Sequence, residues 1–338
     1  MKNIHNSALL FSISFITSLT ITYFLNPSFL EHSEFWAEEG HFYSDALNYS
    51  FFNNILLKDW GIYYSILPRT IAWLVGFFSV SIINVPFIFH LISGIFIAIC
   101  TSIFCFKTFS CIIKSNFLRF LICILFNLNF DFELRYINNI SYYGAIPIIL
   151  FIVYSEYSKK ELSKTISIIS GLFIFILCLS KPIFMSLVPV FLFMIYREIK
   201  NKKILSSRII VSTFSISGSL LQVLSYLFLN TFSEVKAKEN ILNLPLFDLF
   251  NETIFNFLSI PIGNSFGIIY FKLLPLNIIT LLISFILFCL IFIIIRVFYN
   301  EKTIFNLFIY FCISSLINSF LISASGFGPP LNFTQLDF

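Results

Sequence analysis

The sequence predicts an all-α integral membrane protein, a polytopic bundle of about nine transmembrane helices. Of its 338 residues, 58% are hydrophobic and only 11% are charged, and the mean hydropathy is +0.91. A soluble domain carries about 25% charged residues, so a chain this apolar lacks the polar surface that a water-exposed globule needs. We therefore expect a single polytopic membrane domain over residues 1–338.

Nine apolar runs are the candidate spans. All are predicted to be helices, because an open strand cannot satisfy its backbone in lipid and the sequence has no alternating barrel pattern. Their approximate bounds are residues 8–25, 87–106, 117–130, 145–157, 166–180, 183–196, 209–230, 274–296 and 304–325. A further apolar stretch, about 61–80, contains Pro68 and Arg69 and is either a span or a helix lying in the membrane interface.

The charge of the loops decides between these alternatives, because Lys and Arg favour the cytoplasmic side. If 61–80 lies in the interface, the cytoplasmic side receives 14 of the 21 basic residues, and the N-terminus lies inside and the C-terminus outside. Those residues are Lys2, Lys107, Lys114, Arg119, Lys159, Lys160, Lys164, Arg197, Lys200, Lys202, Lys203, Arg208, Arg296 and Lys302. If 61–80 were a span, Lys2 and the later basic loops would lie on opposite sides.

This topology leaves two long outer loops, 26–86 with interfacial helices and 231–273. It also places 13 of the 17 acidic residues outside. Acidic residues contribute little to orientation, so their bias points to a function on the outer face. Long loops without spans are uncommon unless they are functional.

Composition excludes some other classes of protein. The formal net charge of +4 is small and scattered, which argues against nucleic-acid binding. The seven cysteines lack the spacing of metal ligands, so we expect them to be small apolar packing residues.

The first constellation lies about ten residues after the first span, in the segment 35–43. Glu38 and Glu39 are adjacent carboxylates next to Trp36. A partly desolvated carboxylate near the membrane surface can serve as a general base. The alternative is a solvated acidic pair with Trp36 as an interfacial anchor. His41 could complete a metal site with the pair, but the cluster lacks a fourth ligand, so no metal ligands are assigned.

The sequence resembles the GT-C superfamily of multispanning glycosyltransferases, which use polyprenyl-phosphate sugar donors. More narrowly, it resembles an uncharacterised bacterial family with a W-A-E-[DE]-G motif in the first outer loop. The resemblance covers about residues 8–110 and is carried by Trp36-Ala37-Glu38-Glu39-Gly40, Gly61-Ile62-Tyr63-Tyr64 and Leu67-Pro68-Arg69. It implies a GT-C-like fold in the bacterial cytoplasmic (inner) membrane and a catalytic base or metal ligand at Glu38 or Glu39. It leaves open which of the two is the base.

The second constellation, 131–139, joins the outer ends of two apolar runs that are shorter than the hydrocarbon layer. This loop should therefore lie below the outer membrane surface. There Asp131 and Arg135 would line an outward-facing cavity, with Arg135 binding a phosphate and the aromatic residues stacking on a sugar. The alternative is an ordinary loop in which Arg135 pairs with a neighbouring acid.

The third constellation is Lys181-Pro182, at a break in the run 166–196. A lysine near membrane depth should either face an anion, such as a phosphate, or extend its ammonium to the interface.

These observations predict a membrane glycosyltransferase that moves a sugar from a polyprenyl-phosphate donor to a glycan or lipid-linked acceptor on the outer face. Glu38 and Glu39 are the catalytic candidates, and a divalent cation is left open. The alternatives are an O-antigen-type polymerase and a non-enzymatic transporter of lipid-linked oligosaccharides. The candidate substrate-binding residues are Trp36, Tyr63, Tyr64, Arg69, Asp131, Arg135 and Lys181.

Overall fold

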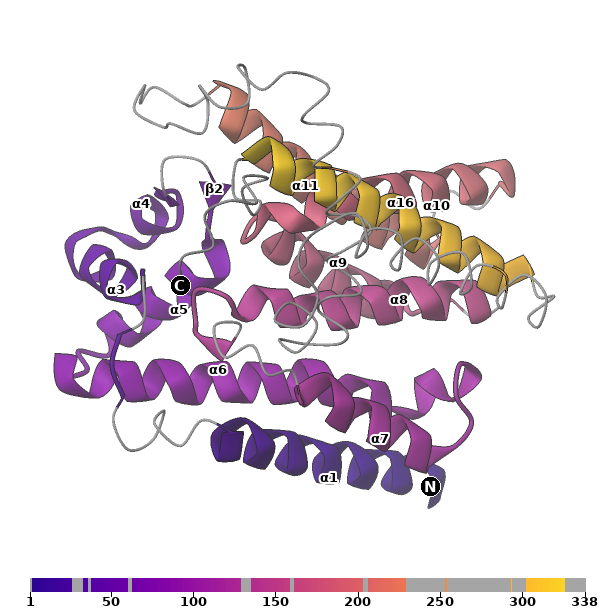
Figure 1. Cartoon of the computed structure of the whole chain (residues 1–338), viewed down its shortest axis with the longest axis horizontal. Coiled ribbons are helices and arrows are strands. Elements are labelled where there is room, and N and C mark those ends of the chain that lie inside the picture. The colour runs from indigo at the N-terminus through magenta and orange to yellow at the C-terminus, as the bar shows by residue number, and fades with distance from the viewer. Residues whose placement is uncertain are drawn as a thin grey trace, which may run out of the picture. The chain divides into compact units, whose positions relative to one another are not determined.

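The computed structural model describes residues 2–25, 33–35, 38–59, 63–128, 135–158, 161–202, 206–228, 253, 293 and 302–325 (Figure 1). Its contacts divide the chain into two compact units, Met1–Phe184 with Met194–Asn230 and Met185–Phe193 with Thr231–Phe338. The single domain predicted over residues 1–338 stays a prediction. The outer loop 231–273 and the span 274–296 lie outside the described residues, apart from Thr253 and Ile293.

The described chain is mostly helical, as predicted. Its α-helices are α1 (Lys2–Leu25), α3 (Glu39–Asn48), α4 (Phe51–Ile55), α5 (Ile66–Phe77), α6 (Val85–Ser102), α7 (Asn116–Asn127), α8 (Ala145–Tyr157), α9 (Lys164–Cys178), α10 (Val188–Lys200), α11 (Ser207–Phe228) and α16 (Lys302–Ser325). Short 3₁₀ helices are η1 (Ile82–Asn84), η2 (Ile103–Cys105), η3 (Lys107–Cys111), η5 (Ile140–Gly144) and η6 (Pro182–Leu187). Two short strands, β1 (Lys58–Asp59) and β2 (Tyr63–Tyr64), pair antiparallel, with Lys58 opposite Tyr64.

Five helical segments of the described chain are long and apolar enough to cross a membrane. They are Ala8–Leu25, Ile82–Cys105, Ile140–Tyr157, Pro182–Lys200 and Ser207–Ser225. Shorter apolar helices cover Asn116–Asn127, Lys164–Cys178 and Phe305–Ser319, where spans are also predicted. A mostly helical chain with apolar, membrane-length helices is therefore confirmed and is compatible with an all-α membrane protein, while nine spans and a GT-C-like arrangement stay predictions.

Helix α5 is too short to cross a bilayer alone. Its 12 residues reach about 18 Å at 1.5 Å per residue, against a hydrocarbon layer of about 30 Å. It packs on α3 and buries Ala72 and Val75 with Phe42 in one apolar cluster. Helix α7 has the same length, so length does not decide between a span and an interfacial helix, and the interfacial interpretation of residues 61–80 stays a prediction.

Helix α1 packs against α6 and α7 along a row of small polar residues (Figure 1). Ser14, Ser18 and Thr22 recur every fourth residue and are buried. The Thr101 hydroxyl on α6 donates to Ser18 Oγ at 3.2 Å, and the Thr22 hydroxyl donates to Asn127 Oδ1 on α7 at 3.2 Å. Small polar residues allow close approach of membrane helices and link them by hydrogen bonds, which fixes α1 beside α7.

In the second unit, the rings of Phe193 and Tyr310 pack with their centroids 5.3 Å apart. This contact joins α16 to the part of α10 that belongs to the same unit.

Candidate active site

The acidic pair lies at the start of α3 and is bound by residues far along the chain. Glu39 is fully buried, and its Oε1 accepts a hydrogen bond from the Ile137 backbone N–H at 2.8 Å. Glu38 is partly exposed, and its Oε2 accepts from Asn138 Nδ2 at 2.7 Å. The positive end of the α3 dipole also favours negative charge here. The pair is thus fixed by partners 98 and 100 positions later.

Arg135 anchors the segment that holds the acidic pair. Its guanidinium is 1% exposed and donates to Thr22 O at 3.3 Å and to Asn127 O at 3.1 Å. These carbonyls lie at the C-terminal ends of α1 and α7, where a cation is favoured by the helix dipoles. Asn127 also donates to Ser18 O. The described bonds of Arg135 are therefore structural, and its phosphate-binding role stays a prediction.

Tyr136 lies beside the acidic pair and extends the site. Burial and, to a lesser degree, the negative charges of Glu39 and Glu34 raise the pKa of the Tyr136 phenol above its ordinary value. The phenol therefore keeps its proton at neutral pH. Its ring packs edge-on against His90 of α6, with the centroids 5.2 Å apart. His90 is not among the site residues predicted from the sequence, although an imidazole within an apolar run is a signal for a polar site.

Arg69 is held in the packing between α3, α4 and α5. It is 4% exposed and forms an ion pair with Asp45 at 2.8 Å. Its Nη1 also lies 3.5 Å from Asn54 Oδ1, and its guanidinium carbon lies 5.0 Å from the centre of the Phe42 ring. Its described contacts are thus within the protein, and its substrate-binding role stays a prediction.

Lys181 lies between two tyrosine rings. Its Nζ donates to the Tyr63 hydroxyl at 3.4 Å and lies 5.3 Å from the centre of that ring. The same Nζ lies 5.5 Å from the centre of the Tyr142 ring, and Lys181 is 8% exposed. Next to it, Ser180 Oγ accepts from the Leu67 backbone N–H at 2.9 Å. The structure therefore brings two predicted residues, Tyr63 and Lys181, together with Tyr142.

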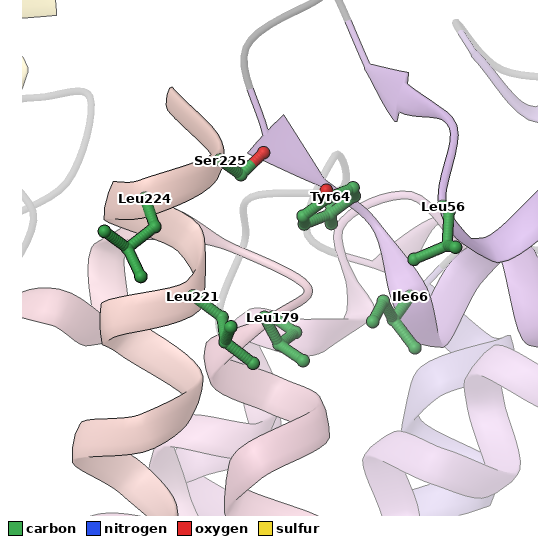
Figure 2. A pocket seen from close by; sticks show the side chains of 7 residues that line it. All are labelled: Leu56, Tyr64, Ile66, Leu179, Leu221, Leu224 and Ser225. Atoms are coloured by element: carbon green, nitrogen blue, oxygen red, sulfur yellow. The ribbon is translucent and has the colours of Figure 1, made fainter. Parts of the chain in front are cut away.

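An apolar pocket of about 350 Å³ lies beside β2, between the end of α9 and α11 (Figure 2). The amide of Gln222 fixes Tyr64 in its wall, since it accepts from the Tyr64 N–H and donates to the Tyr64 carbonyl, each at 3.1 Å. The pocket is lined by Leu56, Tyr64, Ile66, Leu179, Leu221, Leu224 and Ser225.

Two predicted site residues, Trp36 and Asp131, lie outside the described residues. His41 lies on α3 and is exposed. Within the described part of the chain, no group of three or more His, Cys, Asp or Glu side chains is arranged to hold a metal ion.

Comparison of the chain with protein-family models, with curated proteins and with solved structures finds no match.

Proposed function

We propose that the protein is a membrane glycosyltransferase that moves a sugar from a polyprenyl-phosphate donor to a glycan or lipid-linked acceptor. The reaction takes place on the outer face of the bacterial cytoplasmic membrane. The observation that carries the proposal is the carboxylate pair held by neutral amide donors, on the same short segment that contacts a buried lysine.

That segment links the two halves of the proposed site. Ile137 and Asn138 bind the acidic pair, and Tyr142 contacts Lys181. Asn138 and Tyr142 are four residues apart, so their Cα atoms are separated by at most about 14 Å. In the proposed complex, the substrate meets a carboxylate at its sugar end and an ammonium at its phosphate.

The chemistry assigns a separate role to each half. The acceptor hydroxyl gives its proton to a carboxylate while its oxygen forms a bond to C1 of the donor sugar. The bond between C1 and the phosphate oxygen breaks, and the lipid phosphate leaves with the electron pair. The Lys181 ammonium offsets the charge that develops on that phosphate, and the water-poor site strengthens this interaction.

Glu38 is the better general base of the pair. A base must reach the proton that it removes, and Glu38 is partly exposed whereas Glu39 is fully buried. Glu39 instead fixes the start of α3 against the Ile137 backbone.

The apolar pocket supports a lipid-linked donor. Its volume is within the range of small-molecule sites, and most of its lining is aliphatic. Tyr64 and Leu179 line it, while the nearby Tyr63 and Lys181 contact each other. The first isoprene units of the donor would occupy the pocket while the phosphate meets Lys181.

The test is a profile of lipid-linked and surface glycans in cells without the gene, complemented with either the wild-type chain or Glu38→Gln. We expect loss of one sugar, restored by the wild type and not by the variant. Shortened polymers would favour a polymerase, and accumulation of complete lipid-linked oligosaccharide inside the cell would favour a transporter. An unchanged profile contradicts the proposed function.

A further inference from the structure

Asn138 carries a buried hydrogen-bond acceptor that the acidic pair does not use. The residue is 5% exposed, and its Nδ2 donates to Glu38. A carboxylate only accepts hydrogen bonds, so the NH₂ group must face Glu38 and the direction of the amide is determined by chemistry. Asn138 Oδ1 then has no hydrogen-bond partner among the residues that the structure describes. A buried acceptor without a partner is unfavourable, which indicates that a ligand supplies the donor.

The open acceptor, Asn138 Oδ1, lies close to the place where Glu38 would meet the reacting hydroxyl. Oδ1 and Nδ2 of Asn138 share one carbon, so the open acceptor is one amide width from the atom that binds Glu38 Oε2. A single hydroxyl has only one proton and cannot donate to Glu38 and to Asn138 together. Two hydroxyls on neighbouring carbons of a sugar ring have the close spacing that both acceptors require.

We infer that Glu38 and Asn138 together bind a vicinal diol of the acceptor sugar. One hydroxyl donates to Glu38, loses its proton to that carboxylate and attacks the donor. The adjacent hydroxyl donates to Asn138 Oδ1 and does not react. Asn138 therefore determines specificity, because an acceptor that lacks the second hydroxyl leaves Oδ1 unpaired. This inference rests on the proposed function and names the class of acceptor.

The test uses membranes that contain the full chain and a radiolabelled lipid extract of the source cells as donor. The acceptor probes are methyl glucoside, methyl galactoside and methyl mannoside, each compared with its monodeoxy forms. The quantity measured is the ratio of transfer rates, fully hydroxylated probe over deoxy probe, within one variant. Because both rates come from one preparation, a fraction of misfolded protein cancels.

In the wild type, removal of the hydroxyl next to the reacting one should lower the rate about 10- to 100-fold. In Asn138→Ala, the same removal should change the rate by less than about twofold, because the partner is gone. Asn48→Ala is the matched control, since Asn48 is exposed at the other end of α3. It should keep the wild-type ratio.

An Asn138→Ala ratio equal to that of the wild type would overturn the diol subsite. So would a wild type that uses none of the hydroxylated probes while the glycan profile in cells still depends on Glu38. If the profile does not depend on Glu38, the proposed function itself fails, and the two failures are thereby distinguished.

Discussion

Two sets of glutamates in the first unit are held in opposite ways. At the predicted cytoplasmic ends of α8, α10 and α11, Glu198 pairs with Arg208 and Glu156 pairs with Arg197, each at 2.6 Å. At the start of α3, Glu38 accepts a hydrogen bond from the Asn138 amide and Glu39 accepts one from the Ile137 backbone N–H. An arginine partner neutralises a carboxylate, whereas a neutral donor orients it and leaves its charge for another group.

This difference separates a structural role from a chemical one. Glu198 is 1% exposed, and its partner Arg208 also donates to the carbonyls of Ser155 and Ser158 at 2.6 and 2.9 Å. Such a network joins the ends of the helices, and each carboxylate in it has an arginine partner. The α3 pair is positioned by the Asn138 amide and the Ile137 backbone N–H, and firm positioning is what a general base requires.

The first test asks whether the two regions lie on opposite sides of the membrane, as the predicted topology requires. In a Cys111→Ser background, which removes an exposed native thiol, Asn53→Cys and Asn201→Cys provide two exposed labelling sites. Asn53→Cys should react with a membrane-impermeant thiol reagent in intact cells. Asn201→Cys should react only after the membrane is opened. Labelling of both from one side would overturn the predicted topology.

The next largest effect is expected at the acidic pair. Glu38→Gln keeps the shape of the side chain and removes the base, so sugar transfer should fall roughly 10²- to 10⁴-fold while the protein stays in the membrane. Glu34→Gln, at an exposed position nearby, should change transfer by less than about threefold. Glu39→Gln should cost less activity than Glu38→Gln, and the reverse order would make Glu39 the base.

The arginine network should show the opposite pattern. Arg208→Met leaves Glu198 buried without its cation, and breaking such a buried pair costs about 3–5 kcal/mol of unfolding free energy. Thermal unfolding in detergent should detect this as a lower Tm, while the transfer rate per folded molecule stays near wild type. Lys200→Met, at an exposed site on α10, is the control and should leave the Tm unchanged. Loss of transfer in folded Arg208→Met would give the network a chemical role.

The contrast also shows what the sequence could predict. Helices α1, α6 and α11 follow from long apolar runs, because burial of apolar surface dominates at that length. In the sequence, however, Glu38 and Glu198 are both acids beside another charged residue. Their difference comes from contacts across about 100 and 10 positions, respectively.

The same limit applies to the three basic residues predicted to bind phosphate. Arg69 and Lys181 interrupt apolar surroundings in the sequence, and Arg135 lies in a short polar segment between two apolar runs. The structure gives Arg69 an acid and Arg135 two helix ends, while Lys181 lies between aromatic rings. The partners of the α3 glutamates lie about 100 positions away in the sequence and become visible only in three dimensions.

Lys181 tests whether a cation in an aromatic setting serves a ligand. Lys181→Met keeps the apolar stem and removes the charge, so loss of a charge-assisted hydrogen bond to phosphate should weaken donor use about 10- to 100-fold. Lys181→Arg should retain much of the activity. The measurement is transfer rate against donor concentration at matched membrane levels. Unchanged kinetics in the Met variant would mean that Lys181 serves only the packing of Tyr63 and Tyr142.

The smallest effect is expected at the ion pair between Asp45 and Arg69. This pair has an arginine partner, as Glu198 does, but it is partly exposed, as Glu38 is. The Asp45 side chain is 29% exposed, so water screens the pair and compensates part of a lost charge. In Asp45→Asn, the new amide can still accept from Arg69, and Asn54 and the Phe42 ring keep their contacts with the guanidinium. We therefore expect a loss of only about 1 kcal/mol in the free energy of unfolding, measured by thermal unfolding beside Arg208→Met.

A loss as large as that of Arg208→Met would mean that Arg69 depends on Asp45 alone. If donor use also changed in Asp45→Asn, Arg69 would contact the phosphate; unchanged donor kinetics would restrict Arg69 to holding α3 on α5.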